Sequence, residues 1–328
     1  MKKILRLGGV LFLLLMIMGV GSVSAAAKYP TGDISWIIPY GPGGGYDLYS
    51  RAISAQLPKY LPKKVNVVVK NIRGGGGLTG VAQVYKSRPD GYTIGISYLP
   101  SPFVTQTIQG VEKVGYDFTK MTFLAAIVTQ DQGIYVGAKT PYHTLKDLQK
   151  AEKVRFGTTA IGAKTWLDTI MVGKLFEINV IPVPGYKRST EIKLAIQRGD
   201  VAASIHDPPL LHSEIKEGVL RPILFLGSER DPLWPDVPTA KEVGVPGIIP
   251  LQRMVRLILA PPGLPKDVEG VLSSALWKAL HDKDFLAWAE KAKYPVSPMT
   301  SEEVKKSMLE VSENFEPYMD YVKSQLGK

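Results

Sequence analysis

Residues 37–47 read Ile-Ile-Pro-Tyr-Gly-Pro-Gly-Gly-Gly-Tyr-Asp, and residues 67–77 read Val-Val-Val-Lys-Asn-Ile-Arg-Gly-Gly-Gly-Gly. In both stretches a short apolar run rich in β-branched residues, typical of a buried strand, leads into consecutive glycines. A helical pattern of apolar residues follows each one, from Leu48 after the first turn and from Leu78 after the second. Repeated strand, glycine turn and helix predict a mostly parallel sheet with helices on its faces.

The two glycine turns have the chemistry of an anion site. The first turn of a helix has four backbone N–H groups without a helical partner, and the helix dipole adds partial positive charge there. Because glycine has no Cβ atom, a ligand can approach its backbone closely. We therefore expect the paired turns to hold an anion through peptide N–H groups, without a cationic side chain. The alternative is that the glycines only make tight, mobile connections.

The first 25 residues are predicted to be a secretory signal peptide. A basic start precedes an apolar run at residues 7–20, and small residues at 22–25 place the cleavage site after Ala25. The apolar run is shorter than the roughly 20 residues that a membrane span needs. The mature chain is therefore expected to be exported.

Composition excludes several classes of site. The chain has no cysteine, so it has neither disulfides nor a thiolate metal site, and its four histidines show no metal-ligand spacing. The formal net charge is +10, but the basic residues are scattered and form no nucleic-acid stripe. We expect no metal, no cofactor and no nucleic-acid partner.

The chain is long enough for two domains. Residues 34–97 predict a β-α-β-α-β unit, and residues 135–255 predict a second α/β unit, whereas residues 98–122 show an irregular pattern. Near the C-terminus, Thr300 with Glu303 predicts a capping box, and Pro317 should kink or divide the last helix.

Three apparent catalytic or cofactor motifs each lack a feature that the corresponding site requires. Residues 75–80 fit G-x-G-x-x-G, but no acidic residue follows at the distance that a dinucleotide site needs. The first glycine turn lacks the Gly-Lys-Ser/Thr of a nucleotide P-loop. Ser204, His206 and Asp207 lie in one strand and cannot converge as a triad, whose members come from separate elements. We predict no catalytic residue.

Short motifs occur in a characteristic order along the mature chain. They are Ile38–Gly44 with Asp47 and Arg51, Asn71–Gly77, Arg88–Thr93, Phe156–Thr159, Val183-Pro184 with Tyr186-Lys187, Gly199–Val201, Asp236–Thr239 with Glu242–Gly244, and Leu259–Pro265. Together these motifs resemble, nearly end to end, the solute-binding proteins of tripartite tricarboxylate transporters, the Bug family.

The resemblance implies a two-lobed α/β periplasmic binding protein, type II-like, with mixed, mostly parallel sheets and a cleft between the lobes. Residues 28–134 and 256–328 would form the first lobe and residues 135–255 the second, joined by strands near 133–136 and 256–260. It also implies a monomer in the periplasm, a small carboxylate as ligand, and membrane transporter subunits as partners. In that family, backbone N–H groups and ordered water from two glycine loops hold a carboxylate.

The expected ligand-binding residues come from the glycine turns and from the ends of second-lobe strands. They are Tyr40, Gly43, Gly44, Gly45, Asp47, Gly75, Gly76, Gly77, Thr158, Thr159, Trp166, His206 and Asp207. Asp47 could instead cap the following helix, as could Thr158 and Thr159. The family often has a histidine where Trp166 stands and Asp-Asn where His206-Asp207 stand, which favours an aromatic or unusual ligand.

The sequence thus predicts a binding protein that captures a small organic anion for a membrane transporter. Two alternatives stay open: an exported hydrolase or lyase that uses the same cleft, and a ligand sensor that takes no part in transport.

Overall fold

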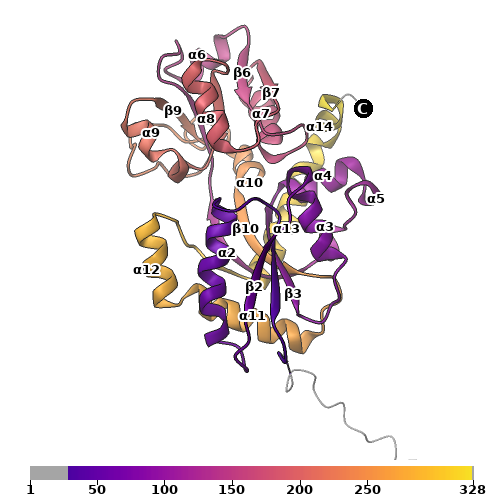
Figure 1. The fold of residues 1–328 in the computed structure, drawn as a ribbon. Helices are drawn as coiled ribbons and strands as arrows, with labels where there is room; N and C mark the ends of the chain where they lie inside the picture. The colour runs from indigo at the N-terminus through magenta and orange to yellow at the C-terminus, as the bar shows by residue number, and fades with distance from the viewer. Residues whose placement is uncertain (1–28, 327–328) are drawn as a thin grey trace, which may run out of the picture.

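The chain folds into two lobes, each built on its own sheet and stacked one above the other in Figure 1. The computed structural model describes residues 29–326, so the predicted signal peptide lies outside the described residues. In spatial order the first sheet contains β11 (Met299–Thr300), β4 (Thr122–Gln130), β10 (Met254–Ala260), β3 (Thr93–Leu99), β1 (Ile34–Ile38) and β2 (Val67–Asn71). The second contains β7 (Val180–Val183), β6 (Val154–Gly157), β8 (Ala203–His206), β5 (Gly133–Gly137) and β9 (Leu220–Phe225).

Helices cover both faces of each sheet (Figure 1). The helices of the first lobe are α2 (Gly45–Gln56), α3 (Leu78–Tyr85), α4 (Ser101–Gln109), α5 (Val111–Val114), α11 (Lys266–Leu280), α12 (Lys283–Ala292), α13 (Ser301–Phe315) and α14 (Met319–Gln325). Those between β5 and β10 are α6 (Leu145–Lys150), α7 (Lys164–Leu175), α8 (Ser189–Arg198), α9 (His212–Lys216) and α10 (Ile249–Gln252).

The first sheet has the predicted β-α-β-α-β order. Strand β1 pairs in parallel with β2 and with β3, and Ile38 at the end of β1 lies opposite Asn71 at the end of β2. Alternate residues of β1 enter different cores, since Trp36 packs on the α2 side and Ile37 on the α3 side. Because β1 and β2 are parallel neighbours in register, the two glycine turns leave the sheet side by side.

The second lobe repeats this arrangement around β6, β7 and β8. Strand β6 pairs in parallel with both β7 and β8, while β5 and β9 complete the sheet in antiparallel orientation. Helix α7 packs on one face and α8 on the other. The loop from Thr158 to Ala163 therefore leaves β6 at its carboxyl end, as the glycine turns do in the first lobe.

The chain passes between the sheets at two places. Residues 131–132 connect β4 to β5, and residues 226–253 lead from β9 to β10. The predicted crossing strands near 133–136 and 256–260 lie within β5 and β10, each inside one sheet. The limits of the lobes at 134/135 and 255/256 stay a prediction.

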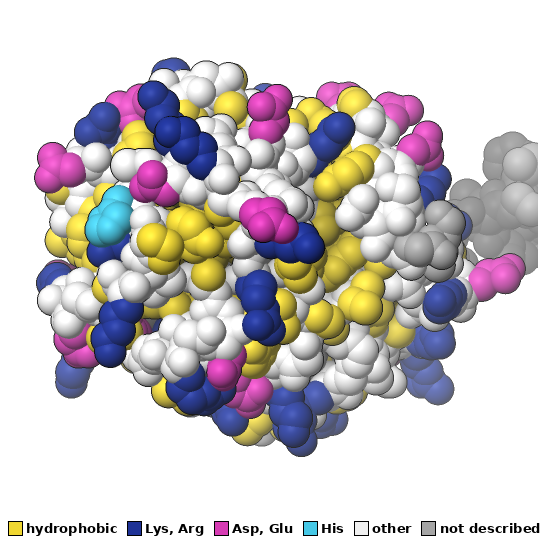
Figure 2. Space-filling model, turned by 90° about the horizontal axis from the view of Figure 1, so that it is seen from above, with side chains coloured by type: hydrophobic (Ala, Val, Ile, Leu, Met, Phe, Trp, Pro, Cys, Tyr) yellow, Lys and Arg dark blue, Asp and Glu magenta, His cyan; other side chains and the backbone are white. Residues whose placement is uncertain are grey.

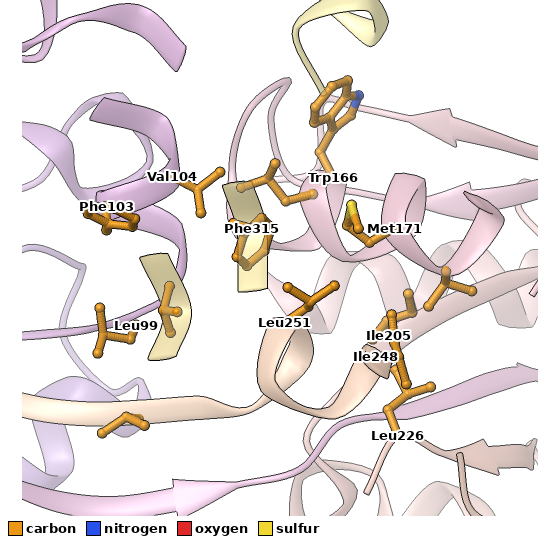
Figure 3. Packing of buried hydrophobic residues seen from close by; sticks show 14 of the residues in the cluster. Leu99, Phe103, Val104, Trp166, Met171, Ile205, Leu226, Ile248, Leu251 and Phe315 are labelled. Atoms are coloured by element: carbon orange, nitrogen blue, oxygen red, sulfur yellow. The ribbon is translucent and has the colours of Figure 1, made fainter. Parts of the chain in front are cut away.

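One apolar cluster extends through both lobes on the side of α10 and the C-terminal helices. Figure 3 shows Leu99, Phe103 and Phe315 of the first lobe together with Trp166 and Met171 of α7. The last helix, α14, also packs on α7. This shared core ties the lobes together where the chain crosses between them.

Local predictions near the ends of elements are mostly confirmed. Thr300 and Glu303 form the capping box of α13, and the helix ends at Phe315, just before Pro317. The irregular reading of residues 98–122 is wrong, because helix α4 occupies 101–109. Within residues 29–326, no helix has the length and apolar character needed to cross a membrane.

Candidate functional site

The first glycine turn leads directly into α2. Gly44 is the N-cap residue, with extended backbone angles and no side-chain cap, and Gly43 has a φ of +80°. The N–H of Gly43 donates to Asp47 Oδ2 at 3.0 Å. Among the described residues, the N–H groups of Gly44, Gly45 and Tyr46 have no hydrogen-bond acceptor. These donors are available to a ligand.

Asp47 joins the two glycine turns. Its side chain, 3% exposed, accepts hydrogen bonds from Arg51 Nε at 3.0 Å and from Asn71 Nδ2 at 3.0 Å. The same Asn71 amide donates to the backbone oxygen of Tyr40 at 2.9 Å. Burial disfavours the charged carboxylate, but the hydrogen bonds from Arg51, Gly43 and Asn71 outweigh it and lower the pKa of Asp47. Asp47 therefore fixes the spacing of the turns.

The backbone conformation of the second glycine turn is one that only glycine adopts without strain. Residues 74–77 all have positive φ, from +55° to +142°. A Cβ atom on Gly77 would lie 2.6 Å from the hydroxyl oxygen of Tyr40, which donates to the Gly76 carbonyl at 3.2 Å. The N–H groups of Gly75 and Gly76 have no acceptor within the part of the chain that the structure describes. Gly76 is exposed, so a solute can reach these donors.

The second lobe lies against this turn. A Cβ atom on Gly76 would lie 3.8 Å from the Cβ of Ala163, the N-cap residue of α7. Nearby, Thr105 Oγ1 of α4 donates to the carbonyl of Gly162 at 3.1 Å. The lobes thus meet at the second glycine turn and at the N-terminus of α7.

Neither threonine at the end of β6 caps α7. The N–H of Thr159 donates to Thr165 Oγ1 at 2.9 Å, so it is used inside the loop. Thr158 is fully buried, its N–H donates to the Val183 carbonyl at 2.9 Å, and its hydroxyl has no partner among the described residues. The hydroxyl of Thr158 is the group that remains free for a ligand or a bound water.

His206 and Asp207 lie at the carboxyl end of β8 and are both buried. Burial lowers the pKa of His206 to about 4, and its Nε2 has no partner within residues 29–326. Asp207 accepts a hydrogen bond from the Gln132 amide and lies 3.8 Å from Arg256 Nη2. A neutral imidazole beside a partly paired carboxylate offers hydrogen-bonding groups to a polar ligand.

The aromatic residues divide into two groups. Tyr40, Tyr46 and Tyr98 form a cluster, with ring centroids of the first two 4.5 Å apart. Trp166 is 5% exposed and belongs to the apolar core shared by the lobes, where Figure 3 shows it. The structure therefore places Tyr46 beside the first glycine turn and Trp166 in core packing.

Arg256 was not among the predicted site residues. It lies in β10 and is 6% exposed, with its guanidinium carbon 4.5 Å from the Tyr46 ring centroid and 5.0 Å from that of Tyr49. A Cβ atom on Gly45 would lie 3.8 Å from Arg256 Nη2. The signal in the sequence was a single arginine inside the otherwise apolar run at 254–260.

Charge elsewhere does not suggest a different site. Figure 2 shows the molecule from above, and there the basic and acidic side chains are interspersed. Among the described residues, no group of three or more histidine, aspartate or glutamate side chains could hold a metal ion. The paired turns and the residues facing them remain the candidate site.

The fold defines a class of protein. The periplasmic binding protein BugD aligns over 89% of this chain and 98% of its own with a TM-score of 0.73 at 23% identity. MatC from Rhodopseudomonas palustris with bound malate aligns over 90% of this chain and all of its own, with a TM-score of 0.72 at 22% identity. The two-lobed α/β fold of solute-binding proteins is thereby confirmed.

The family follows from the sequence comparison. The model of the tripartite tricarboxylate transporter family receptor matches residues 50–319, and this chain belongs to that family. Protein BugT of Bordetella pertussis is 28% identical over 319 residues, which cover 89% of this chain and 90% of BugT. The family consists of solute-binding receptors, which confirms the prediction of a binding protein and not an enzyme.

Proposed function

We propose that this receptor captures a small carboxylate in the periplasm and presents it to the membrane subunits of a tripartite tricarboxylate transporter. The observation that carries the proposal is the pair of glycine turns, held side by side by Asp47 and Asn71, with free N–H groups on both. Related folds have been solved with malate and with adipate, both dicarboxylates. Family membership supports the transporter partner.

The proposed binding mode uses the peptide N–H groups of both turns. An acidic ligand placed there would accept hydrogen bonds from the start of α2 and from Gly75 and Gly76. Charge-assisted bonds of this kind contribute roughly 1.5–3 kcal/mol each. The hydroxyl of Thr158 and the side chains of His206 and Asp207 would meet the part of the ligand that faces the second lobe.

Closure of the lobes would allow the transporter to distinguish the ligand-bound receptor from the free receptor. The two crossings, at 131–132 and 226–253, are the proposed hinge between residues 28–134 with 256–328 and residues 135–255. We propose that the mature receptor acts as a monomer, because one closed pair of lobes already encloses the site. Sedimentation of the ligand-loaded chain as a dimer would contradict this.

A ligand screen tests the proposal directly. Thermal shift with dicarboxylates, tricarboxylates, aromatic acids and amino acids, followed by calorimetry on the hits, should identify at least one organic acid. Mass spectrometry should recover that acid unchanged after incubation. Failure of every organic acid to bind would overturn the carboxylate proposal, and a modified ligand would point to an enzyme.

Gly44→Val is the sharpest single test of the cradle. Gly44 has ordinary φ, and an added Cβ would meet nothing closer than the Gly41 carbonyl at 3.9 Å, so the fold should tolerate valine. The side chain would nevertheless cover the free N–H groups, and affinity should fall at least tenfold. Gly76→Val is a weaker test because a β-branched residue is strained at a φ of +68°.

Gly270→Val is the matched control. Gly270 is exposed in α11, far from the turns along the chain, with no atom within 4 Å of an added Cβ. Unchanged affinity in both Gly44→Val and Gly270→Val would show that the cradle is misplaced. Uptake of radiolabelled ligand by cells with and without the receptor would test the transporter partner, and unchanged uptake would favour a sensor.

A further inference from the structure

A buried cation lies beside the first glycine turn. Arg256 projects from β10 to within contact of the start of α2, where the N–H groups of Gly45 and Tyr46 are unpaired. Its guanidinium lies against the rings of Tyr46 and Tyr49. The described chain therefore places a full positive charge where peptide N–H groups alone were expected.

The guanidinium is only partly satisfied by its neighbours. The side chains of Tyr46 and Tyr49 interact with it, and its hydrogen bond to Gln130 Oε1 is long, at 3.4 Å. Arg256 Nε is buried without a partner, and Asp207 Oδ2 lies 3.8 Å from Nη2, beyond hydrogen-bond distance. A buried charge is costly unless it is both paired and hydrogen-bonded. The unpartnered Nε and the distance to Asp207 therefore leave the guanidinium open to a further acceptor.

Two tyrosine rings separate Arg256 from the second glycine turn. Tyr40 donates to the Gly76 carbonyl, its ring lies 4.5 Å from that of Tyr46, and Tyr46 in turn lies 4.5 Å from the Arg256 guanidinium carbon. The contacts thus run in series from Gly76 through Tyr40 and Tyr46 to Arg256. Donors for negative charge lie at both ends of this series, and an aromatic pair lies between them.

We propose that Arg256 is a specificity-determining residue that pairs with a second acidic group of the ligand. The inference rests on the proposed carboxylate function. One acid group binds the N–H groups of Gly75 and Gly76, and the other binds the guanidinium of Arg256 together with the N–H groups at the start of α2. The spacer between the acid groups passes along the edges of Tyr40 and Tyr46, so the structure favours a diacid with separated acid groups over a monoacid.

Asp207 sets the strength of this subsite. In the described structure it is the nearest carboxylate to Arg256, and the Gln132 amide also donates to it. Because the Arg256–Asp207 distance is longer than a hydrogen bond, a ligand carboxylate can approach the guanidinium without first breaking a tight ion pair. Since Arg256 is 6% exposed, the ligand must enter while the lobes are apart.

The test compares diacids with monoacids of equal chain length on wild type, Arg256→Gln and Arg256→Lys. Calorimetry should show that wild type binds the diacid at least 50-fold more tightly than the monoacid. Arg256→Gln should lose most of this preference, because the diacid loses much more affinity than the monoacid. Arg256→Lys, which keeps the charge but lacks the fork of donors, should retain part of it.

Two further variants keep the test independent of folding and of net charge. Arg198→Gln makes the same change at an exposed arginine that pairs with Asp200 in the second lobe, and it should leave the diacid preference intact. Arg256→Gln combined with Asp207→Asn avoids an unpaired buried carboxylate if the single variant unfolds.

The outcomes separate the inference from the proposed function. Equal diacid preference in wild type and in a folded Arg256→Gln variant would overturn the role of Arg256 while leaving carboxylate binding in place. Tight monoacid binding without any diacid preference in wild type would do the same. If wild type bound no organic acid, the proposed function itself would fail.

Discussion

Replacing Asp47 by alanine should weaken both folding and ligand binding. The change removes the acceptor of the Gly43 N–H and of the Asn71 amide, and hydrogen bonds to a charged group contribute roughly 1.5–3 kcal/mol each. The pair with Arg51 adds little, because that arginine side chain is half exposed. We expect the free energy of unfolding to fall by about 3–6 kcal/mol in urea titrations.

The affinity for the ligand should fall as well, because the two turns lose the side chain that holds them together. Isothermal calorimetry on the folded fraction at low temperature measures this loss, which we expect to reach at least tenfold. Asp282→Ala is the control, since Asp282 is also buried and caps α12 by accepting from the N–H groups of Asp284 and Phe285. It should cost similar stability and leave affinity unchanged. Equal losses of affinity in both variants would refute the bridging role of Asp47.

Three other outcomes follow from the buried polar groups and the lobe contacts. Burial lowers the pKa of His206 from 6.5 to about 4, so stability should be lost as pH falls across this range, and His206→Gln should flatten that part of the profile in urea titrations. Burial raises the pKa of Asp168 to about 6 despite its pair with Lys164; its stabilising contribution is complete below pH 3.8 and lost as pH rises through 6. Asp168→Asn should remove that pH dependence, and an unchanged profile would contradict the assignment. Tyr321→Phe removes the hydrogen bond to the Ile170 carbonyl and should cost about 1 kcal/mol in the same assay, whereas no change would mean that this hydrogen bond does not stabilise the packing of α14 on α7.

The sequence was informative where local chemistry decides the conformation. The glycines of the second turn all adopt positive φ, and the β-branched run before them forms β2, so a local pattern predicted a local structure. The same holds for the capping box of Thr300 and Glu303. Each of these features depends on residues that are neighbours along the chain.

Helix α4 was missed because its surroundings hide its pattern. Residues 101–106 are all buried, since α4 lies between the first sheet and the second lobe, and a helix covered on most sides shows no amphipathic stripe. Two threonines within it also lower its helix propensity. Tertiary packing decided this element.

Arg256 was missed for a related reason. In a strand that is buried along its whole length, one arginine among apolar residues does not by itself mark a binding site, and only the fold brings it to Gly45 and Tyr46. Trp166 shows the opposite case. Its place in the sequence suggested a ligand contact, but the side chain packs in the core that joins the lobes.

The buried polar groups between the lobes argue that closure depends on a ligand. Thr158 Oγ1, His206 Nε2 and Arg256 Nε are all buried without partners among the described residues, and each unsatisfied group opposes the closed arrangement. The apolar core on the side of α10 also packs the lobes together, and it involves none of these polar groups. A ligand that supplies acceptors and donors to these groups binds the closed form better than the open form, and that differential affinity is what can shift the population. In the proposed binding mode, the groups that contact the ligand would therefore also couple its binding to the movement of the lobes.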